Sequence, residues 1–351
     1  MRRMYFGTTS TGVPILIFRL ESSSGVVVSV MEFGAAVVSI ETPDREGRLG
    51  PIVPGFDHLA PYLEQIQPQT TTLGRYAGRV LDTTLLPQDP SPPEPHALDR
   101  HETPYKLHRT ASGFHNTVWW GEALSEGVRF HYCSPEGEEG YPGKLDCSVE
   151  YRLDHAGNLR VAHRATTDAC TVVDLASRIH FNLRDGGRSS VLDHELEIAA
   201  EEIVEVDRTG IPTGHFWPVE GSLLDFRSPR RVGAEMWASS RPRGDYDDCY
   251  VLRHRGERMG VVVRLRDSSS GRNLEIATTQ HGIRLETRPA TSSSSDSRRL
   301  SLGLCPQNFP DAANHRHFPS PALSPGSFYE QTTVYRFWHD SSAQARDESG
   351  R

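Results

Sequence analysis

Two pairs of side chains that could do chemistry are each spaced two residues apart. Arg178 and His180 form one pair, and Arg284 and Glu286 form the other; both stand in stretches typical of β-strands. Because side chains alternate along a strand, the members of each pair share one face. If the two faces meet, His180 and Glu286 could serve as an acid–base pair. The alternative is that His180 is a packed, hydrogen-bonded ring and that Glu286 pairs with an arginine.

Cys305 is a third candidate, because a thiolate is a strong nucleophile. Its neighbours Leu302, Gly303 and Leu304 are typical of a core strand, and a free cysteine in such a place is more often a small buried apolar group. The five cysteines are widely spaced, form no C-x-x-C pair and are expected to be reduced.

Other familiar chemistries lack their motifs. Glycine-rich phosphate loops, G-x-S-x-G elbows and Walker patterns are absent. Only Lys106 and Lys144 are lysines, so imine chemistry has few candidates. His315 and His317 have a spacing that a metal could use, but a surface loop is the preferred interpretation. We therefore expect no metal and no organic cofactor.

The elements that must position these residues are short strands. Alternating or β-branched runs are separated by Gly, Pro, Asp and Ser clusters, and long amphipathic helices are absent. The pattern predicts an all-β fold, a large antiparallel β-sandwich. The expected strands are 26–30, 128–133, 145–153, 159–164, 172–183, 261–265, 274–279 and 332–337.

Three segments are predicted to be solvated additions to the strands. Residues 85–97 form a proline-rich loop, which cannot donate a regular ladder of hydrogen bonds, and residues 291–298 form a serine-rich loop. Residues 341–351 are a polar tail. None of the three marks a domain boundary, so residues 1–340 are expected to form a single domain.

Composition excludes several classes of partner. Lys and Arg number 38 against 46 Asp and Glu, a formal net charge of −8 in 351 residues. This balance argues against nucleic acid and anionic membrane surfaces as partners. No apolar run approaches the ~18 residues that span a bilayer. The N-terminus lacks the apolar core of a secretory signal, so a cytoplasmic location is expected.

Several segments, taken in order, resemble the aldose 1-epimerase (galactose mutarotase) family, whose members interconvert the α and β anomers of free sugars. The resemblance runs from about Glu32 to Phe337, and many landmarks in the family's order carry it. They include Gly74-Arg75-Tyr76-Ala77-Gly78-Arg79, Leu107-His108, the segment Ser134 to Gly143, His180-Phe181-Asn182-Leu183, Ile211-Pro212-Thr213-Gly214, Tyr246-Asp247 and Phe309-Pro310-Asp311-Ala312-Ala313-Asn314. The resemblance implies one large antiparallel β-sandwich with a sugar-sized groove.

The resemblance also implies roles for single residues. His108 and Arg79 match the family's pocket histidine and arginine, and Asp247 matches its pocket aspartate. The family's acid, a histidine, falls at Arg178, and its base, a glutamate, falls at Cys305. A glutamine that contacts the sugar corresponds to Arg284.

Arginine is effectively always protonated, and a free thiol is a poor substitute for a carboxylate. Each positioned proton-transfer group contributes roughly 10²–10⁴-fold in rate, so ordinary mutarotase activity is expected to be feeble. His108, His180 and Asp247 are then the candidates for acid–base or orienting work. Arg79, Arg178 and Arg284 could hold a carboxylate or another oxyanion.

The leading hypothesis is a divergent isomerase, epimerase or cyclase acting on a small oxygenated molecule, an anionic one included, in small-molecule biosynthesis. One alternative is ordinary interconversion of sugar anomers. Another is a non-catalytic sugar-binding or regulatory protein. The sequence does not define the oligomeric state.

Overall fold

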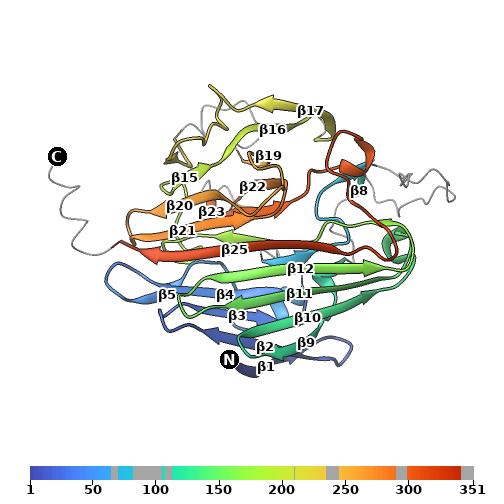
Figure 1. The fold of residues 1–351 in the computed structure, drawn as a ribbon. Coiled ribbons are helices and arrows are strands. Elements are labelled where there is room, and N and C mark those ends of the chain that lie inside the picture. The colour runs from blue at the N-terminus through green and yellow to red at the C-terminus, as the bar shows by residue number, and fades with distance from the viewer. Residues whose placement is uncertain are drawn as a thin grey trace.

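Strands make up nearly all of the regular structure in the computed structural model, which describes residues 1–64, 70–81, 105–106, 113–208, 210–234, 245–289 and 299–340 (Figure 1). Within those ranges the helical elements are α1 (Ala60–Leu63) and the single 3-10 turns Phe114–Asn116, Glu138–Gly140 and Ala312–Asn314. The prediction of an all-β, antiparallel fold is confirmed. The predicted loops 85–97 and 291–298 and the tail 341–351 lie outside the described residues.

Two large sheets contain most of the strands. The nine-stranded sheet has the order β18 (Arg230–Arg231), β15 (Glu195–Ile198), β20 (Gly260–Asp267), β21 (Arg272–Thr278), β25 (Tyr329–His339), β12 (Leu159–Thr167), β11 (Leu145–Leu153), β10 (Gly127–Ser134), β9 (Trp120–Leu124). The seven-stranded sheet has the order β17 (Pro212–Pro218), β16 (Ala200–Val206), β19 (Asp247–Leu252), β22 (Gly282–Pro289), β23 (Arg299–Gln307), β14 (Ala176–Phe181), β6 (Thr71–Leu73).

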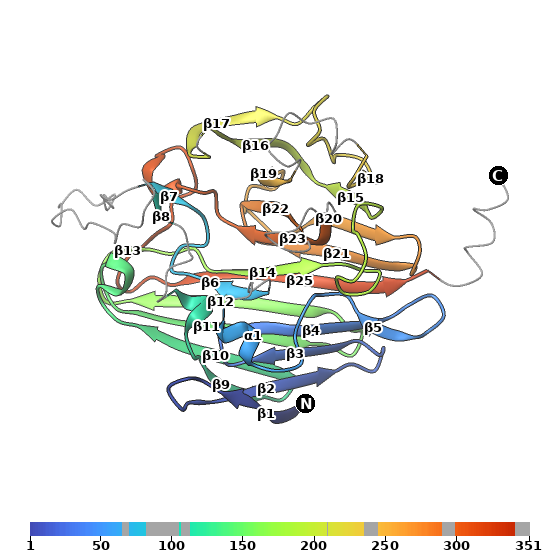
Figure 2. The same cartoon turned by 180° about the vertical axis from the view of Figure 1, so that it is seen from behind.

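The remaining strands form smaller sheets. The five-stranded sheet holds β1 (Arg2–Thr8), β2 (Pro14–Glu21), β3 (Val27–Met31), β4 (Ala36–Pro43) and β5 (Leu49–Pro51). Two further pairs are β7 (Val80–Leu81) with β8 (Tyr105–Lys106) and β13 (Thr171–Val172) with β24 (Ala322–Leu323). Seen from behind, the five-stranded sheet lies below the seven-stranded one (Figure 2).

The seven-stranded sheet packs one of its faces against the nine-stranded sheet. Ile179, Leu285 and Leu304 on that face are fully buried and belong to the main apolar core. Phe181 of β14 meets Tyr335 of β25 with ring centroids 5.9 Å apart. Because side chains alternate, the residues between these apolar positions, Arg178, Arg284 and Glu286 among them, must project from the opposite face.

One predicted strand is divided in the structure. The run 172–183 was expected to be continuous, but β13 ends at Val172 and β14 begins at Ala176. Between them the backbone N–H of Asp174 donates to Arg75 O (2.9 Å), and Asp174 O accepts from Ala77 N (2.9 Å). These bonds form an isolated parallel bridge to the Arg75–Ala77 segment, so the chain leaves the antiparallel ladder at this point.

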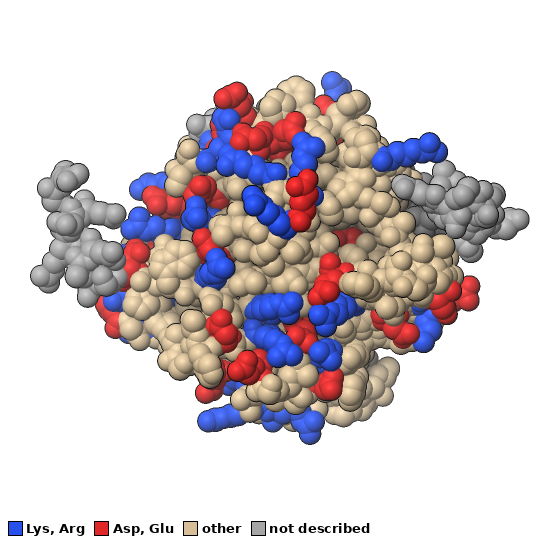
Figure 3. All heavy atoms as spheres, in the orientation of Figure 1, with Lys and Arg blue, Asp and Glu red and all other residues tan. Residues whose placement is uncertain are grey.

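Positive and negative side chains are interspersed on the face shown in Figure 3. Many charged side chains of the described residues pair across strands, as Arg164 does with Glu330 at 2.9 Å. In the described part of the chain, no helix has the length and apolar character required to cross a membrane.

Candidate functional site

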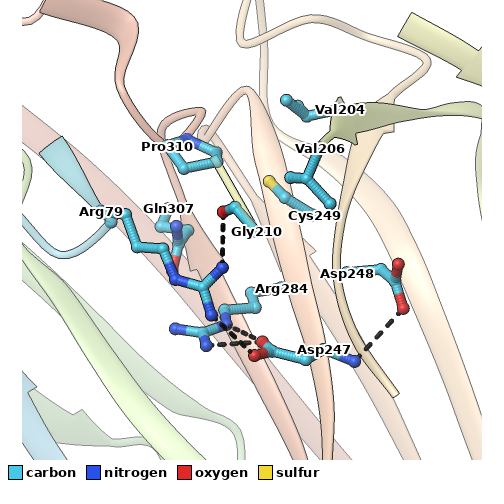
Figure 4. A pocket seen from close by; sticks show the side chains of 11 residues that line it. Arg79, Val204, Val206, Gly210, Asp247, Asp248, Cys249, Arg284, Gln307 and Pro310 are labelled. Atoms are coloured by element: carbon cyan, nitrogen blue, oxygen red, sulfur yellow. Dashed lines mark hydrogen bonds and ion pairs between the residues drawn. The ribbon is translucent and has the colours of Figure 1, made fainter. Parts of the chain in front are cut away.

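The candidate site is a pocket at the open face of the seven-stranded sheet (Figure 4). Its space for water-sized spheres is only about 30 Å³, and the wider hollow around it, about 430 Å³, includes open solvent. One side is polar and the other is largely apolar. Its lining consists of Gly78, Arg79, Val204, Val206, Gly210, Asp247, Asp248, Cys249, Arg284, Gln307 and Pro310.

The carboxylate of Asp247 stands between two guanidinium groups. Arg79 Nη2 lies 3.1 Å from Asp247 Oδ2, and Arg284 Nη2 lies 2.5 Å from Asp247 Oδ1. Arg284 Nε also donates to Oδ1 at 2.7 Å, and Arg79 Nη1 donates to Gly210 O at 2.7 Å. The side chain of Asp247 is 44% exposed, so a ligand in the pocket could reach its oxygens.

The strand register explains this meeting. Asp247 pairs with Glu286 and Cys249 with Arg284 across β19 and β22, so all four residues project from one face. Burial alone would lower the pKa of Arg284, but the nearby carboxylates of Asp247 and Glu286 outweigh burial and raise it. Arg284 is therefore a fixed positive charge that orients Asp247.

A second charged cluster lies on the same sheet face but is buried. Arg178 donates to both carboxylate oxygens of Glu286, with Nη2 2.7 Å from Oε2. His180 Nε2 lies 3.0 Å from Glu286 Oε1, and its Nδ1 lies 3.2 Å from Ser301 Oγ. The three charged or titratable side chains are at most 5% exposed, and none lines the pocket.

Gly303 makes room for this buried cluster. A Cβ at that position would stand 2.5 Å from Glu286 Cγ and 2.9 Å from His180 Cε1, closer than packed atoms approach. Burial would raise the pKa of Glu286, but Arg178, His180 and Arg284 outweigh it and hold that pKa well below the ordinary value. Glu286 is accordingly a carboxylate at neutral pH and is bonded to Arg178.

Cys305 is 1% exposed and packs against Leu73, Ala77 and Ala176. Burial raises the pKa of its thiol to about 12, although Arg178 acts in the opposite direction. Cys305 is therefore a neutral thiol at pH 7, and it does not line the pocket. The strand-core interpretation of this cysteine fits its surroundings better than a nucleophile does.

The structure separates the predicted site residues into two groups. Arg79, Asp247 and Arg284 meet in the pocket, whereas Arg178, His180 and Glu286 meet in the buried cluster. The predicted acid–base contact between His180 and Glu286 exists, but an arginine shares it. His108 lies outside the described residues.

Sequence reasoning did not select several pocket residues. Gln307 and Pro310 stand in segments that carry the resemblance, and Cys249 follows Asp247 by two positions on the same strand face. Strand alternation places Cys249 on the face of Asp247 and Gln307 on the face of Cys305, whereas Pro310 lies beyond the end of β23 and outside any such pattern. Val204 and Val206 could not be selected from the sequence, because valine at alternate positions is ordinary in a strand.

Asp247 is the acid that faces the two arginines of the pocket. Arg79 and Arg284 contribute two positive charges and Asp247 one negative charge, whereas alternation along β19 turns the side chain of Asp248 away from them (Figure 4). Arg178, which was expected to help bind an anion, is bonded to Glu286 away from the pocket. Among the residues that the structure describes, no group of three or more His, Cys, Asp or Glu side chains could hold a metal ion.

This arrangement places the chain in the class of large antiparallel β-sandwich proteins that carry a polar pocket on an open sheet face. The sequence profile of the aldose 1-epimerase family matches residues 17–336, and the chain belongs to that family.

Individual relatives are similar over nearly their whole length. Galactose mutarotase of Mus musculus is 34% identical over 343 residues, which cover 95% of this chain and 98% of that protein. Aldose 1-epimerase of Escherichia coli is 28% identical, covering 93% of this chain and 96% of that protein. The crystal structure of an aldose epimerase homologue from C. elegans superposes with a TM-score of 0.81 at 27% identity, covering 92% of this chain and 98% of that one.

A further solved structure supports the fold alone. Galactose 1-epimerase from Lactobacillus acidophilus superposes with a TM-score of 0.79 at 21% identity, covering 96% of this chain and 98% of that chain. The predicted family and the predicted sandwich fold are thus both confirmed.

Proposed function

We propose that this protein is a divergent aldose 1-epimerase-like isomerase that binds a neutral, hydroxyl-rich molecule in its pocket and acts on a substrate other than a simple free hexose. The observation that carries the proposal is a contrast between two sets of residues. Arg79, Asp247 and Arg284 form a connected wall of hydrogen-bonding groups facing the pocket. Arg178 and Cys305 occupy the positions where the family's acid and base are expected. Both are buried, and neither can serve in proton transfer at neutral pH.

A hydroxyl-rich ligand suits this wall. Each hydroxyl can donate to Asp247 and accept from a guanidinium group, and charged hydrogen bonds are the stronger kind. Asp247 already accepts from both guanidinium groups, which leaves less positive charge for a carboxylate or a phosphate, so the proposal is a neutral ligand in place of the anionic ligand that the arginines alone suggested. Val204, Val206 and Pro310 offer an apolar surface to the carbon skeleton.

The low mutarotase activity expected on free hexoses follows from the side chains of Arg178 and Cys305. Opening a hemiacetal ring needs a base for the anomeric hydroxyl and an acid for the ring oxygen. A thiol whose pKa is about 12 is not a base at pH 7. An arginine bonded to Glu286 releases no proton there.

Ordinary mutarotation is the second candidate. Identity of 33–34% to mammalian galactose mutarotases over 95% of the chain favours it. In that case Asp247, together with His108, would supply the proton transfer. Such a role requires the carboxylate to work while it accepts hydrogen bonds from two arginines.

Polarimetry of freshly dissolved α-D-galactose and α-D-glucose separates the candidates. The wild type is compared with Asp247→Asn and with Asp146→Asn, a matched control whose surface carboxylate pairs with Lys144 at 2.9 Å. The proposal expects no acceleration above the uncatalysed rate. It also expects a rise in thermal unfolding midpoint with a suitable polyol, which Asp247→Asn abolishes and Asp146→Asn keeps.

Rapid mutarotation that depends on Asp247 would overturn the proposal in favour of the second candidate. Binding of a polyol without turnover of any epimerisable sugar or glycoside would instead identify a non-catalytic binding protein.

A further inference from the structure

Asp174 is a buried acid that belongs to neither charged cluster. Its residue exposure is 0%, and it lies between β13 and β14. Through its backbone it bonds Arg75 O and Ala77 N, each at 2.9 Å. These bonds fix the segment that leads directly to Gly78 and Arg79 in the pocket.

The carboxylate of Asp174 fixes a second segment. Both of its oxygens lie 3.1 Å from the backbone N–H of Asn308. Gln280 Nε2 donates to Oδ1 at 3.2 Å, and Tyr329 OH lies 3.5 Å from the same oxygen. Asn308 follows Gln307, so the carboxylate anchors the chain where β23 ends and the pocket wall begins.

Tyr76, the bridge partner of Asp174, holds the same wall. Its hydroxyl donates to Phe309 O at 2.6 Å and accepts from Ala312 N at 3.2 Å. The backbone N–H of Asp311 in turn donates to Arg79 O at 2.6 Å. Segment 307–312, which presents Gln307 and Pro310 to the pocket (Figure 4), is therefore joined to the Arg79 segment through one buried hub.

Uncharged donors alone satisfy this carboxylate. In the ranges that the structure describes, no arginine, lysine or histidine side chain bonds to it. Its titratable neighbours are Tyr76, Tyr329 of β25, Cys249 of β19 and Cys305 of β23, and the pKa of each is raised. Burial raises the pKa of Asp174 itself to about 6, against the effect of its hydrogen bonds. A charge that is costly to bury and stands beside a pocket is a mark of function.

We propose that Asp174 is a positioning residue of the pocket: its ionised carboxylate holds segment 307–312 against Arg79, and ligand binding weakens when that carboxylate is protonated or replaced. The ligand part of this inference rests on the proposed function. The role of Asp174 in holding segment 307–312 does not rest on the proposed function, so an experiment can contradict one and leave the other intact.

Asp174→Asn is the direct test because it removes the charge and keeps the shape. The side-chain carbonyl can still accept from Asn308, and Gln280 Oε1, which is buried and has no partner among the described residues, can accept from the new amide. We expect amide exchange over 307–312 at pH 8 to accelerate about tenfold, the difference between a charged and a neutral hydrogen bond. We also expect the thermal midpoint to stay equal or to rise, since a buried charge is removed.

A pH series distinguishes a positioning role from a merely structural one. Only in a positioning role does the exchange protection of 307–312 follow the ionisation of Asp174. After correction for intrinsic exchange rates, wild-type protection of 307–312 should fall between pH 8 and pH 5, and that of Asp174→Asn should stay flat. Asp267→Asn is the matched control: Asp267 is equally buried but bonds to Arg184 at 3.0 Å. It should lower the midpoint and leave exchange over 307–312 unchanged.

Two results would overturn the inference. One is a lower thermal midpoint of Asp174→Asn with unchanged exchange over 307–312. The other is an identical pH profile of exchange for this variant and the wild type. If the variant does not fold, the wild-type pH series still decides, together with Tyr76→Phe, which should speed exchange at Ala312 yet keep the pH response. Binding of methyl β-D-galactopyranoside, a neutral hydroxyl-rich molecule that is not a free hexose, should weaken from pH 8 to pH 5 only in the wild type when it is followed by thermal shift. Absence of binding of this glycoside at any pH counts against the proposed function and leaves the exchange result to decide the role of Asp174.

Discussion

Replacing Glu286 by glutamine should destabilise the protein far more than an ordinary loss of one ion pair. The side chains of Arg178 and Glu286 are 5% and 4% exposed, so the substitution leaves a buried guanidinium without its counter-charge. Breaking such a pair typically costs about 3–5 kcal/mol of unfolding free energy. Glu330→Gln is the control, because Glu330 pairs with Arg164 at 2.9 Å where the two side chains are 35% and 52% exposed. That substitution should cost about 0–1 kcal/mol.

Guanidinium denaturation followed by circular dichroism at pH 7 measures both costs. The double variant Arg178→Met with Glu286→Leu should recover most of the loss, because an apolar pair can replace a buried ion pair at little cost. Equal effects of Glu286→Gln and Glu330→Gln would contradict this prediction, since they would mean that the buried charge is hydrated or free to relax.

The pH dependence of the same pair has a definite sign. The pKa of Glu286 lies well below 4.5 in the folded protein, so the unfolded chain takes up this proton first as pH falls. The stabilisation is therefore complete above pH 4.5 and is lost as pH falls towards the folded pKa. Glu286→Gln should lack this acid-dependent loss.

Three further outcomes are expected. Gly303→Ala should lower the free energy of unfolding by about 1–3 kcal/mol, because its Cβ would stand 2.5 Å from Glu286 Cγ; an unchanged denaturation midpoint would contradict the close packing. Iodoacetamide at pH 8 should label exposed Cys133 and spare buried Cys305, as peptide mass spectrometry can determine; rapid labelling of Cys305 would show that it is open to solvent. Burial lowers the pKa of His163 from 6.5 to about 4, so its contribution to stability should fall by up to about 3 kcal/mol between pH 6.5 and pH 4, and His163→Gln should remove that part of the pH profile measured by denaturation.

Strand alternation allowed part of the site to be predicted from the sequence. It correctly placed Arg178 and His180 on one face of their strand, and Arg284 and Glu286 on one face of theirs, because the period of two is fixed by backbone geometry. It did not indicate that β22 lies between β19 and β23, which decides that Arg284 meets Asp247 while Glu286 meets Arg178. Pairing between strands far apart in the chain depends on tertiary packing, which periodicity does not contain.

The division of the predicted strand 172–183 has a similar cause. Its apolar and β-branched residues alternate with polar ones over most of its length, so local preference favours one continuous strand. The break at Asp174 exists because the Arg75–Ala77 segment, about a hundred residues earlier, takes its backbone hydrogen bonds. Asp174 is one of several polar residues in this run, so the sequence alone does not single it out, and its part in the hub described above is seen only in the structure.

Arg178 and Cys305, the positions where the resemblance places the family's acid and base, lie in one electrostatic environment. Arg284 and Cys305 are direct partners across β22 and β23, and the thiol lies within electrostatic reach of Arg178, Arg284 and Glu286. A glutamate at position 305 would therefore stand among two guanidinium groups, which would stabilise its ionised form and weaken it as a base. The small neutral thiol avoids placing another carboxylate beside Glu286. The wall of Arg79, Asp247 and Arg284 is then the polar surface of the pocket that is open to a ligand.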